Sequence, residues 1–295
     1  MVSLRATAAG GTPEYWAQVA KGARGVAQPG LNASTLKALA VPLPPLTEQR
    51  RIAEVLDRAE ALRAKRRAAL AQLDTLAQAI FLGLFGDPGT NPRGWKTRPF
   101  RELVSEFRYG TSNKSQAHGK PALRIPNMIG GIIDLSDLKL VPVDATEFER
   151  LRLVDGDVLF VRPNGNPDFV GRCAVFDGSV AAQSGFPAAE FIFASYLIRA
   201  RLREQLTPIY LRESMLGAEG RRELQSRSKT STGQFNINTE NLGAIAVPVP
   251  PVTLQRDFAR RVAAVEKLKT AHRASLADMD ALFASLQHRA FRGEL

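Results

Sequence analysis

The spacing of apolar residues predicts two long helices, one near each end of the chain. From Thr47 and again from Thr253, apolar residues recur at intervals of three and four, and no proline or glycine interrupts them until Gly83 and Gly293. This spacing is typical of one face of an α-helix. Each pattern therefore predicts a helix of about 36 residues, roughly 54 Å long at 1.5 Å per residue.

Each predicted helix carries one apolar seam at heptad positions. The first seam runs through Ile52, Leu56, Ala59, Arg63, Arg66, Leu70, Leu73, Ala77, Ile80 and Leu84, and the second through Phe258, Val262, Val265, Lys269, His272, Leu276, Met279, Phe283, Leu286 and Ala290. Both seams break at the same two places, and Leu62 and Leu268 are the apolar neighbours beside the breaks. The seams predict a coiled coil between the helices, centred on Ile52, Leu56, Leu70, Leu73, Ile80, Val262, Leu276, Met279 and Leu286. The alternative is that each seam packs separately on a globular core.

The segment between the helices has the pattern of a mixed domain. A Gly/Pro-rich boundary, residues 86–97, is followed by short apolar runs that predict strands, at Leu123–Ile125, Val158–Val161, Cys173–Phe176 and Phe191–Ile198, and by a helical stretch from Ile209 to Gln225. The fold class is therefore α/β (α+β) with two long helices. A compact domain returns the chain toward the first helix, and closing a loop within one chain costs less than association. We expect the helices to pair antiparallel within one chain.

The two helical segments are copies of one another. Shifting the chain by 206 positions aligns "AVPLPPLTEQR", from Ala40, with "AVPVPPVTLQR", from Ala246, and the match continues without a gap to Phe85 and Phe291. Alternating apolar residues before the Pro-Pro pair predict a short edge strand. The prolines break it, and Thr47 and Thr253 are in position to cap the helices. The chain is thus a duplicated segment that flanks a domain.

Charge and composition narrow the class of protein. A net charge of +11 and 44% hydrophobic residues indicate a globular protein with a polyanionic partner, most often nucleic acid. No stretch approaches the roughly 18–20 apolar residues needed to cross a bilayer, and the N-terminal residues lack the apolar core of a signal peptide. One cysteine, Cys173, suits the cytoplasm, and with three histidines it makes a zinc site improbable.

Two polar loops of the central domain carry side chains suited to reading DNA. Arginine and lysine can read guanine, asparagine and glutamine can read adenine, and hydroxyl groups can hold phosphates. The candidates are Arg108, Tyr109, Thr111, Ser112, Asn113, Lys114 and Gln116 in the first loop, Arg162 and Asn164 in a turn, and Arg227, Lys229, Thr230, Ser231, Gln234 and Asn236 in the second loop. The alternative for each of these residues is that it is an ordinary solvent-exposed loop residue without a role in DNA binding.

Catalytic motifs are missing from the sequence. "NPDF", Asn166–Phe169, approaches the Asn/Asp-Pro-Pro-Tyr/Phe loop of adenine methyltransferases, but Asp168 stands in place of the second proline. No Gly-rich loop offers a cofactor site, and no nuclease-like cluster or Walker lysine loop is present. We therefore expect a chain that is not an enzyme and needs no cofactor or metal.

The phrase "AVPLPPLTEQRRIAEVLDRAEAL" resembles the conserved regions of the specificity (S) subunit of type I restriction-modification systems, which act in phage defence. The order "PRGWKTRPFRELV", "YGTSNKS", "ALRIPNM", "GDVLFVRPNG" and "VGRCAVF" resembles that family's target recognition domain. The resemblance implies a non-catalytic reader of a bipartite DNA site. It implies two antiparallel helices that set the gap between half-sites and dock methyltransferase subunits, and through them the restriction subunit. Arg58, Lys65 and Arg67 on the outer face of the first helix are candidates for pairing with acidic partner surfaces.

The chain departs from that family pattern before residue 40, where a full-length member carries a whole recognition domain. The resemblance divides the chain into a remnant of a preceding recognition domain (1–46), a spacer helix (47–85), a recognition domain (86–250) and a second spacer helix (251–295). A truncated gene, a recombining cassette and a half-size subunit that works with a second copy all fit this layout. The rival interpretation is a structural coiled-coil adaptor, or an inactive remnant, without DNA recognition of its own.

Overall fold

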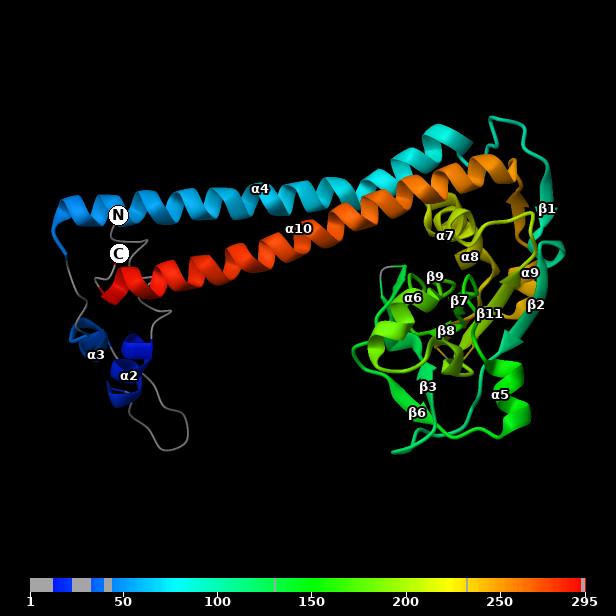
Figure 1. Ribbon diagram of the computed structural model, residues 1–295, viewed down its shortest axis with the longest axis horizontal. Helices are drawn as coiled ribbons and strands as arrows, with labels where there is room; N and C mark the ends of the chain where they lie inside the picture. The colour runs from blue at the N-terminus through cyan, green and yellow to red at the C-terminus, as the bar shows by residue number, and fades with distance from the viewer. Residues whose placement is uncertain (1–12, 23–32, 40–43, 130, 232, 293–294) are drawn as a thin grey trace. The chain divides into compact units, whose positions relative to one another are not determined.

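The computed structural model describes residues 13–22, 33–39, 44–129, 131–231, 233–292 and 295, and divides the chain into two compact units. The helical unit comprises Met1–Asp74 and Lys267–Leu295, and the α/β unit comprises Thr75–Glu266. Two long helices, α4 (Leu46–Phe85) and α10 (Val252–Arg292), each run through both units (Figure 1). The helical unit also contains α2 (Pro13–Gly22) and α3 (Ala33–Lys37). The rest of the predicted remnant domain lies outside the described residues.

Contacts within the helical unit establish that α4 and α10 run antiparallel. Arg63 pairs with Asp280 at 2.6 Å, and Asp74 pairs with Lys269 at 2.8 Å, so residue numbers rise on one helix as they fall on the other. All nine predicted seam residues are buried or half-buried. The predicted fold class, including the antiparallel orientation, is confirmed.

The break in the apolar seam is filled by its own cations. Arg63 is only 16% exposed and Lys269 13%, because each pairs with an aspartate of the opposite helix. Arg63 also contacts Glu60 and lies 4.3 Å above the ring of Phe283. Leu62 and Leu268, the apolar neighbours of the break, are 55% and 50% exposed.

Both long helices begin in the same way, although not with the threonine cap that the sequence predicted. The helices start one residue earlier, at Leu46 and Val252, so Thr47 and Thr253 lie inside the first turn. Instead, the glutamine of each repeat donates its Nε2 hydrogen to the carbonyl of the first proline, Gln49 to Pro44 and Gln255 to Pro250, both at 2.8 Å. The Pro-Pro-x-Thr-x-Gln phrase is thus a structural device for starting a helix directly after an extended chain.

The sheet core of the α/β unit has four antiparallel strands in the order β2-β11-β7-β9. Their bounds are β2 (Val104–Tyr109), β11 (Leu197–Leu202), β7 (Val158–Val161) and β9 (Cys173–Val175). All four residues of β7 are buried, as expected for the continuous apolar run Val158–Val161, which was predicted with the same bounds. Burial raises the pKa of the Cys173 thiol, on β9, to about 12.

Smaller sheets extend this core. One has the order β10-β3-β6, with β10 (Ile192–Phe193), β3 (Lys120–Leu123) and β6 (Lys139–Val141). Another has the order β12-β13-β8, with β12 (Lys229–Ser231), β13 (Gln234–Asn236) and β8 (Pro163–Asn164). The pairs β1 (Thr97–Pro99) with β14 (Ala246–Pro248), and β4 (Met128–Ile129) with β5 (Ile132–Ile133), complete the strands of the described residues. β14 is the edge strand predicted from the second repeat; its counterpart in the first repeat, residues 40–43, lies outside the described residues.

Five short and medium helices belong to the same unit. They are α5 (Ala145–Leu151), α6 (Gly178–Ala181), α7 (Pro208–Leu216), α8 (Ala218–Arg227) and α9 (Thr239–Gly243), and single 3-10 turns lie at Phe100–Glu102, Ile125–Asn127, Ala182–Ser184 and Ala188–Glu190. The predicted helix Ile209–Gln225 is in fact two helices that are interrupted at Gly217. The predicted strand Phe191–Ile198 is likewise split into β10 and the start of β11 by a turn.

An aromatic cluster anchors the domain ends of both long helices. The rings of Phe81, Phe85, Tyr210 and Phe258 lie with centroids 4.8–5.6 Å apart, and all four side chains are buried. By length and composition alone, α4 is apolar enough to cross a membrane, contrary to the expectation from sequence. Only 17% of its apolar window is buried, and Phe81 and Phe85, at the end of the helix, are buried in the aromatic cluster.

Candidate nucleic-acid interface

Arg108 and Tyr109, predicted as the start of the first loop, are instead the last residues of β2, and a glycine after them lets the loop lie close to the neighbouring segment of the chain. A Cβ atom on Gly110 would lie 2.1 Å from the carbonyl oxygen of Phe193, so no other residue fits there without a shift of the backbone. The next residue, Thr111, donates its backbone N–H to the same carbonyl at 3.0 Å and is buried. From Ser112 to Gln116 every residue is exposed.

The second predicted loop is a strand hairpin that pairs with the turn after β7. Lys229 of β12 lies opposite Asn236 of β13, and Phe235 of β13 lies opposite Asn164 of β8. Gln234 is exposed and Asn236 is half-buried. Lys229, Thr230 and Ser231 are placed as the backbone of β12, and their side chains lie outside the described residues. The small sheet thus brings the candidates of the turn and of the second loop together.

The first loop meets the turn after β7 and the start of α9 at Tyr109. Its hydroxyl accepts a hydrogen bond from the backbone N–H of Thr239, at 3.1 Å, and lies 3.4 Å from that residue's hydroxyl. The guanidinium of Arg162 lies 4.8 Å above the Tyr109 ring, within the range of a cation–π contact. Segments that are far apart in the sequence therefore form one continuous surface, which we call the loop surface: Tyr109, Ser112, Asn113, Lys114, Arg162, Asn164, Gln234 and Asn236.

Several predicted contact residues are already engaged within the protein. Arg108 donates its Nε hydrogen to Glu106 at 2.9 Å, and this hydrogen bond, with one from the buried Arg199, lowers the pKa of the Glu106 carboxyl below its usual value. Arg227 pairs with Glu223 at 2.5 Å, one turn back along α8. These arginines must break an ion pair before they can bind DNA.

The predicted amides also make internal hydrogen bonds. Asn113 donates its Nδ2 hydrogens to the carbonyl of Pro142 at 2.9 Å and to the carboxylate of Glu147 at 3.2 Å. The side-chain oxygen of Asn164 accepts the backbone N–H of Asn166 at 2.9 Å. The Oδ1 atom of Asn236 is buried and has no hydrogen-bond partner among the described residues.

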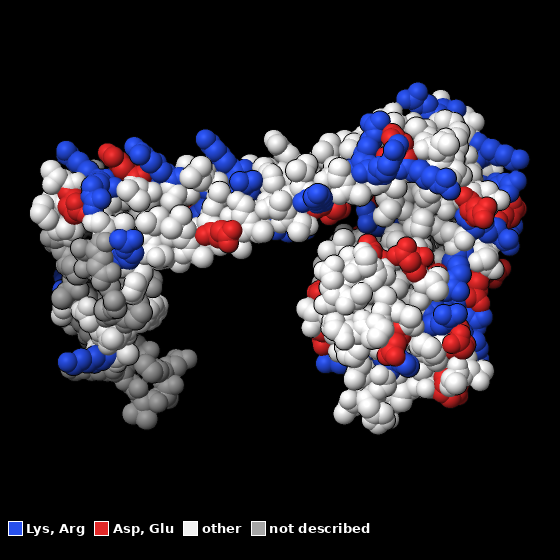
Figure 2. All heavy atoms as spheres, in the orientation of Figure 1, with Lys and Arg blue, Asp and Glu red and all other residues white. Residues whose placement is uncertain are grey.

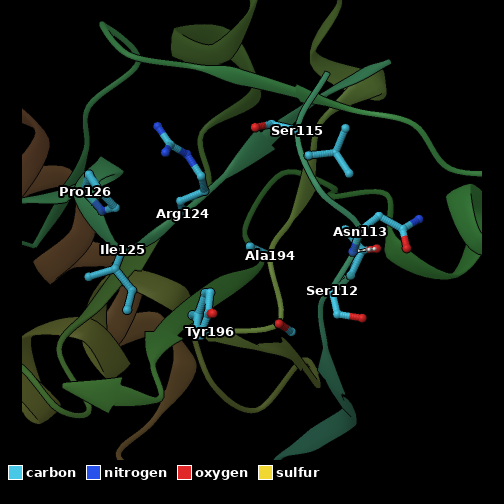
Figure 3. A pocket seen from close by; sticks show the side chains of 11 residues that line it. Ser112, Asn113, Ser115, Arg124, Ile125, Pro126, Ala194 and Tyr196 are labelled. Atoms are coloured by element: carbon cyan, nitrogen blue, oxygen red, sulfur yellow. Dashed lines mark hydrogen bonds between the residues drawn. The ribbon is translucent and has the colours of Figure 1, made fainter. Parts of the chain in front are cut away.

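An open hollow of about 330 Å³ adjoins the loop surface (Figure 3). Its sides are formed by the loop Ser112–Ser115, by the turn Arg124–Pro126, and by Ala194–Tyr196. The sequence did not point to Arg124 or Tyr196, because each lies within a predicted strand, Arg124 in Leu123–Ile125 and Tyr196 in Phe191–Ile198. Arg124 pairs with Asp137 at 2.9 Å, whereas Tyr196 is 59% exposed.

Charge alone does not mark the boundary of this interface. Figure 2 shows lysine and arginine interspersed with acids at the edge of the α/β unit that carries β1, β2 and α9, and few charges over α6. Lys114 and Arg162 belong to no ion pair found among the described residues. Neither is therefore held by an acid there, although Arg162 lies above the ring of Tyr109.

The methyltransferase-like phrase has a structural role. Asp168 accepts a hydrogen bond from Gln225 at 2.9 Å through its carboxylate, and its carbonyl accepts one from Arg172 at 2.7 Å. Asn166 accepts the backbone N–H of Asp168 at 2.9 Å. Among the described residues, no group of three or more His, Cys, Asp or Glu side chains is arranged to hold a metal ion.

Comparisons with known proteins agree with this architecture. A family model described as the type I restriction modification DNA specificity domain matches residues 17–72. The chain is 29% identical over 273 residues to the Type I restriction enzyme EcoKI specificity subunit of Escherichia coli K12, and 24% identical to the StySPI specificity subunit of Salmonella potsdam. Each alignment covers 86% of this chain, which spans 57% of the length of either relative.

Solved structures share the fold. A structure reported for complex assembly and conformational transition of the type I R-M system matches with a TM-score of 0.63, at 20% identity, over 96% of this chain and 69% of that one. The HsdS subunit from Thermoanaerobacter tengcongensis matches with a TM-score of 0.52, at 21% identity, over 96% of this chain and 71% of that one.

An α/β unit and a pair of antiparallel repeat helices make up the fold that these solved structures share. The chain is similar to the specificity subunits of type I restriction-modification systems. The prediction of a non-catalytic chain agrees with this class, since both curated relatives are named as specificity subunits.

Proposed function

We propose that this chain reads one half of a bipartite DNA target through the loop surface of its α/β unit. The observation that carries the proposal is the contact of Arg162 and Thr239 with Tyr109 at the end of β2, together with the pairing of the turn after β7 with the second loop through β8 and β13. Free cations, exposed amides and hydroxyl groups on one rigid scaffold are what base-edge and phosphate contacts require. The net charge of +11 favours association with DNA.

A selection from randomised duplex DNA tests the reading function. We expect the full chain to enrich one short sequence, and its affinity to fall steeply with salt, because each neutralised phosphate releases counterions. Binding that depends on salt but enriches no sequence would leave only a non-specific DNA-binding protein. Binding that is absent at low salt would favour the structural adaptor.

We further propose that the helix pair docks methyltransferase subunits through an apolar side of the helical unit. In the heptad pattern, Leu62, Leu268 and Leu282 flank the seam on one side, and they are 55%, 50% and 58% exposed. In an antiparallel pair these flanking positions of both helices face the same side. The other side carries the ion pairs of Arg67 with Glu60 and with Asp280. Apolar side chains on one side only favour a helical partner there.

The outer cations of α4 are therefore secondary to this proposal. Arg58 and Lys65 are exposed and remain candidates for acidic partner surfaces. Arg67, which the sequence placed with them, is engaged by Glu60 at 3.1 Å and by Asp280 at 3.5 Å.

Co-purification with a type I modification subunit tests the docking. We expect the double variant Leu62→Glu/Leu282→Glu to lose the complex, and the matched variant Ala64→Glu/Ala284→Glu, which adds the same charges at exposed positions away from that side, to keep it. If both variants co-purify equally well, the leucine side is not the docking surface.

A further inference from the structure

Tyr196 presents an exposed aromatic ring from a firmly held backbone. It lies in the turn between β10 and β11 and its side chain is 59% exposed. Its carbonyl accepts the N–H of Arg162 at 2.9 Å, Ser195 donates to the carbonyl of Thr111 at 2.7 Å, and Leu197 donates to that of Ala194 at 2.9 Å. The turn is thus tied to the loop after β2 and to the turn after β7, and it is closed by the bond from Leu197 to Ala194, so the ring is held in place at its base while its face is exposed.

The ring differs from its neighbour Tyr109 in having no internal partner. Tyr109 lies under the guanidinium of Arg162 and shares its hydroxyl with Thr239. In the part of the chain that the structure describes, Tyr196 makes no side-chain hydrogen bond and no ring contact. A large exposed aromatic with a fixed backbone is a typical recognition residue, because little conformational entropy is lost when a ligand covers it.

The hollow beside Tyr196 has an apolar wall and a polar rim. Ile125 and Pro126 lie on the same side as Tyr196, and Ser112, Asn113 and Ser115 stand across from them (Figure 3). At about 330 Å³, the hollow is at the lower end of the range for small-ligand sites. An apolar wall that faces hydroxyl and amide groups suits a ligand with one apolar group surrounded by polar groups.

We propose that Tyr196 is a specificity-determining residue that contacts the C5 methyl group of a thymine in the DNA target. The methyl group is the one apolar feature of the major groove, and proteins read it by apolar contact. Ile125 and Pro126 would complete the apolar surroundings of the methyl group, while Ser112 and Ser115 face the polar edges and phosphates beside it. This inference rests on the proposed DNA-reading function and names the base that one part of the interface reads.

Replacing thymine by uracil tests the contact, since the two bases differ by that methyl group alone. The full chain is first used to select its preferred duplex, and each thymine of that duplex is then replaced by uracil in turn. We expect uracil at one position to weaken binding by wild type about fourfold, the effect of exposing one methyl-sized group. Tyr196→Ala should bind both duplexes with the same reduced affinity, and Tyr196→Phe should behave as wild type.

Controls separate this contact from folding and from the proposed function. Ile132→Ala, which removes an exposed apolar side chain on β5 outside the hollow, should keep the wild-type response to uracil. The inference is overturned if wild type is insensitive to uracil at every position, if the selected sequence contains no A·T pair, or if Tyr196→Ala remains sensitive. If wild type selects no sequence at all, the proposed function fails and the inference fails with it.

Discussion

At the scale of single residues, the structure ranks the cations that the sequence could only list. Lys114 and Arg162 are free of ion pairs among the described residues, whereas Arg108 and Arg227 are bound to Glu106 and Glu223. A cation that must break an ion pair with an acid before it can contact DNA contributes less free energy to binding than an unpaired one does. We expect Arg162→Ala to cost about 1–3 kcal/mol on the selected duplex and to relax one position, and Lys114→Ala to lower the salt slope by about 1. Titrations at several salt concentrations measure both, and larger effects from Arg108→Ala and Arg227→Ala would contradict the ranking.

Gly110 is a residue at which one methyl group should reshape the interface. A Cβ atom there would clash with the carbonyl of Phe193 and with the backbone of Ala194, which is part of the hollow. We expect Gly110→Ala to weaken DNA binding at least as much as Tyr196→Ala, with a lower melting temperature as well. The exposed Gly165, whose Cβ would meet no atom within 4 Å, is the matched control. Equal behaviour of the two alanine variants would show that the close approach has no role.

Glu106, on β2, should make the stability of the fold depend on pH. Hydrogen bonds from Arg108 and Arg199 lower its pKa in the folded state. A depressed carboxyl pKa contributes stability above the pKa of the unfolded chain, and this contribution is lost as the pH falls through the folded value. Glu106→Gln should therefore cost about 1.5–3 kcal/mol at pH 7, the range for hydrogen bonds to charged groups. Urea denaturation of both proteins at pH 7 and pH 3 measures this difference, and a cost that persists unchanged at pH 3 would contradict it.

At the scale of elements, the duplication explains how the long helices find their register. Arg63 and Lys269 are equivalent in the repeat, and so are Asp280 and Asp74, so the two interhelical ion pairs are copies of one interaction. Each helix carries a cation and, eleven residues later, an aspartate. Only the antiparallel arrangement at this register satisfies both pairs. The polar break in each seam is therefore a device for specifying alignment rather than a defect of packing.

Charge exchange tests the register. Arg63→Asp and Asp280→Arg should each destabilise the helical unit, by up to about 1 kcal/mol because Asp280 is 44% exposed. The double variant should recover part of that loss as a coupling energy of about 0.5–1 kcal/mol. Thermal unfolding of the four proteins provides the cycle. Strict additivity of the two single effects would mean that the pair has no part in alignment.

Elements were predictable from the sequence where one signal dominated. The long helices, the buried strand Val158–Val161 and the antiparallel pairing follow from period, apolar run and loop closure. The errors fall where tertiary contacts override local pattern. Tyr196 sits in an apolar run, but Ser195 and Leu197 are held in a turn by hydrogen bonds to Thr111 and Ala194. Gln49 and Gln255, whose side chains bond to the proline carbonyls at the start of each helix, belong to no capping pattern that a single sequence would reveal. The loop candidates were identifiable by residue type, but their ion pairs depend on strands far apart in the chain.

At the scale of the whole molecule, the α/β unit and both long helices belong to one chain. Cross-linking tests that connection. Cysteine pairs at Leu56 with Leu286, and at Ala77 with Val265, should form disulfides within a monomer, because the ion pairs of Arg63 with Asp280 and of Asp74 with Lys269 place them at matching levels of antiparallel helices. Cys173 is buried and its thiol pKa is raised to about 12, so it should not compete. Cross-links only between chains, or only between Ile52 and Phe258, would contradict intrachain antiparallel pairing.

The most direct measurement is a map of adenine methylation in cells that carry this gene, in cells that lack it, and in cells where it carries Arg162→Ala. If the chain directs a modification complex, methylation at one defined sequence should disappear with the gene, return with the wild-type chain, and return with relaxed specificity at one position with the variant. An identical methylation pattern in all three would contradict the central claim that this chain chooses the DNA sequence.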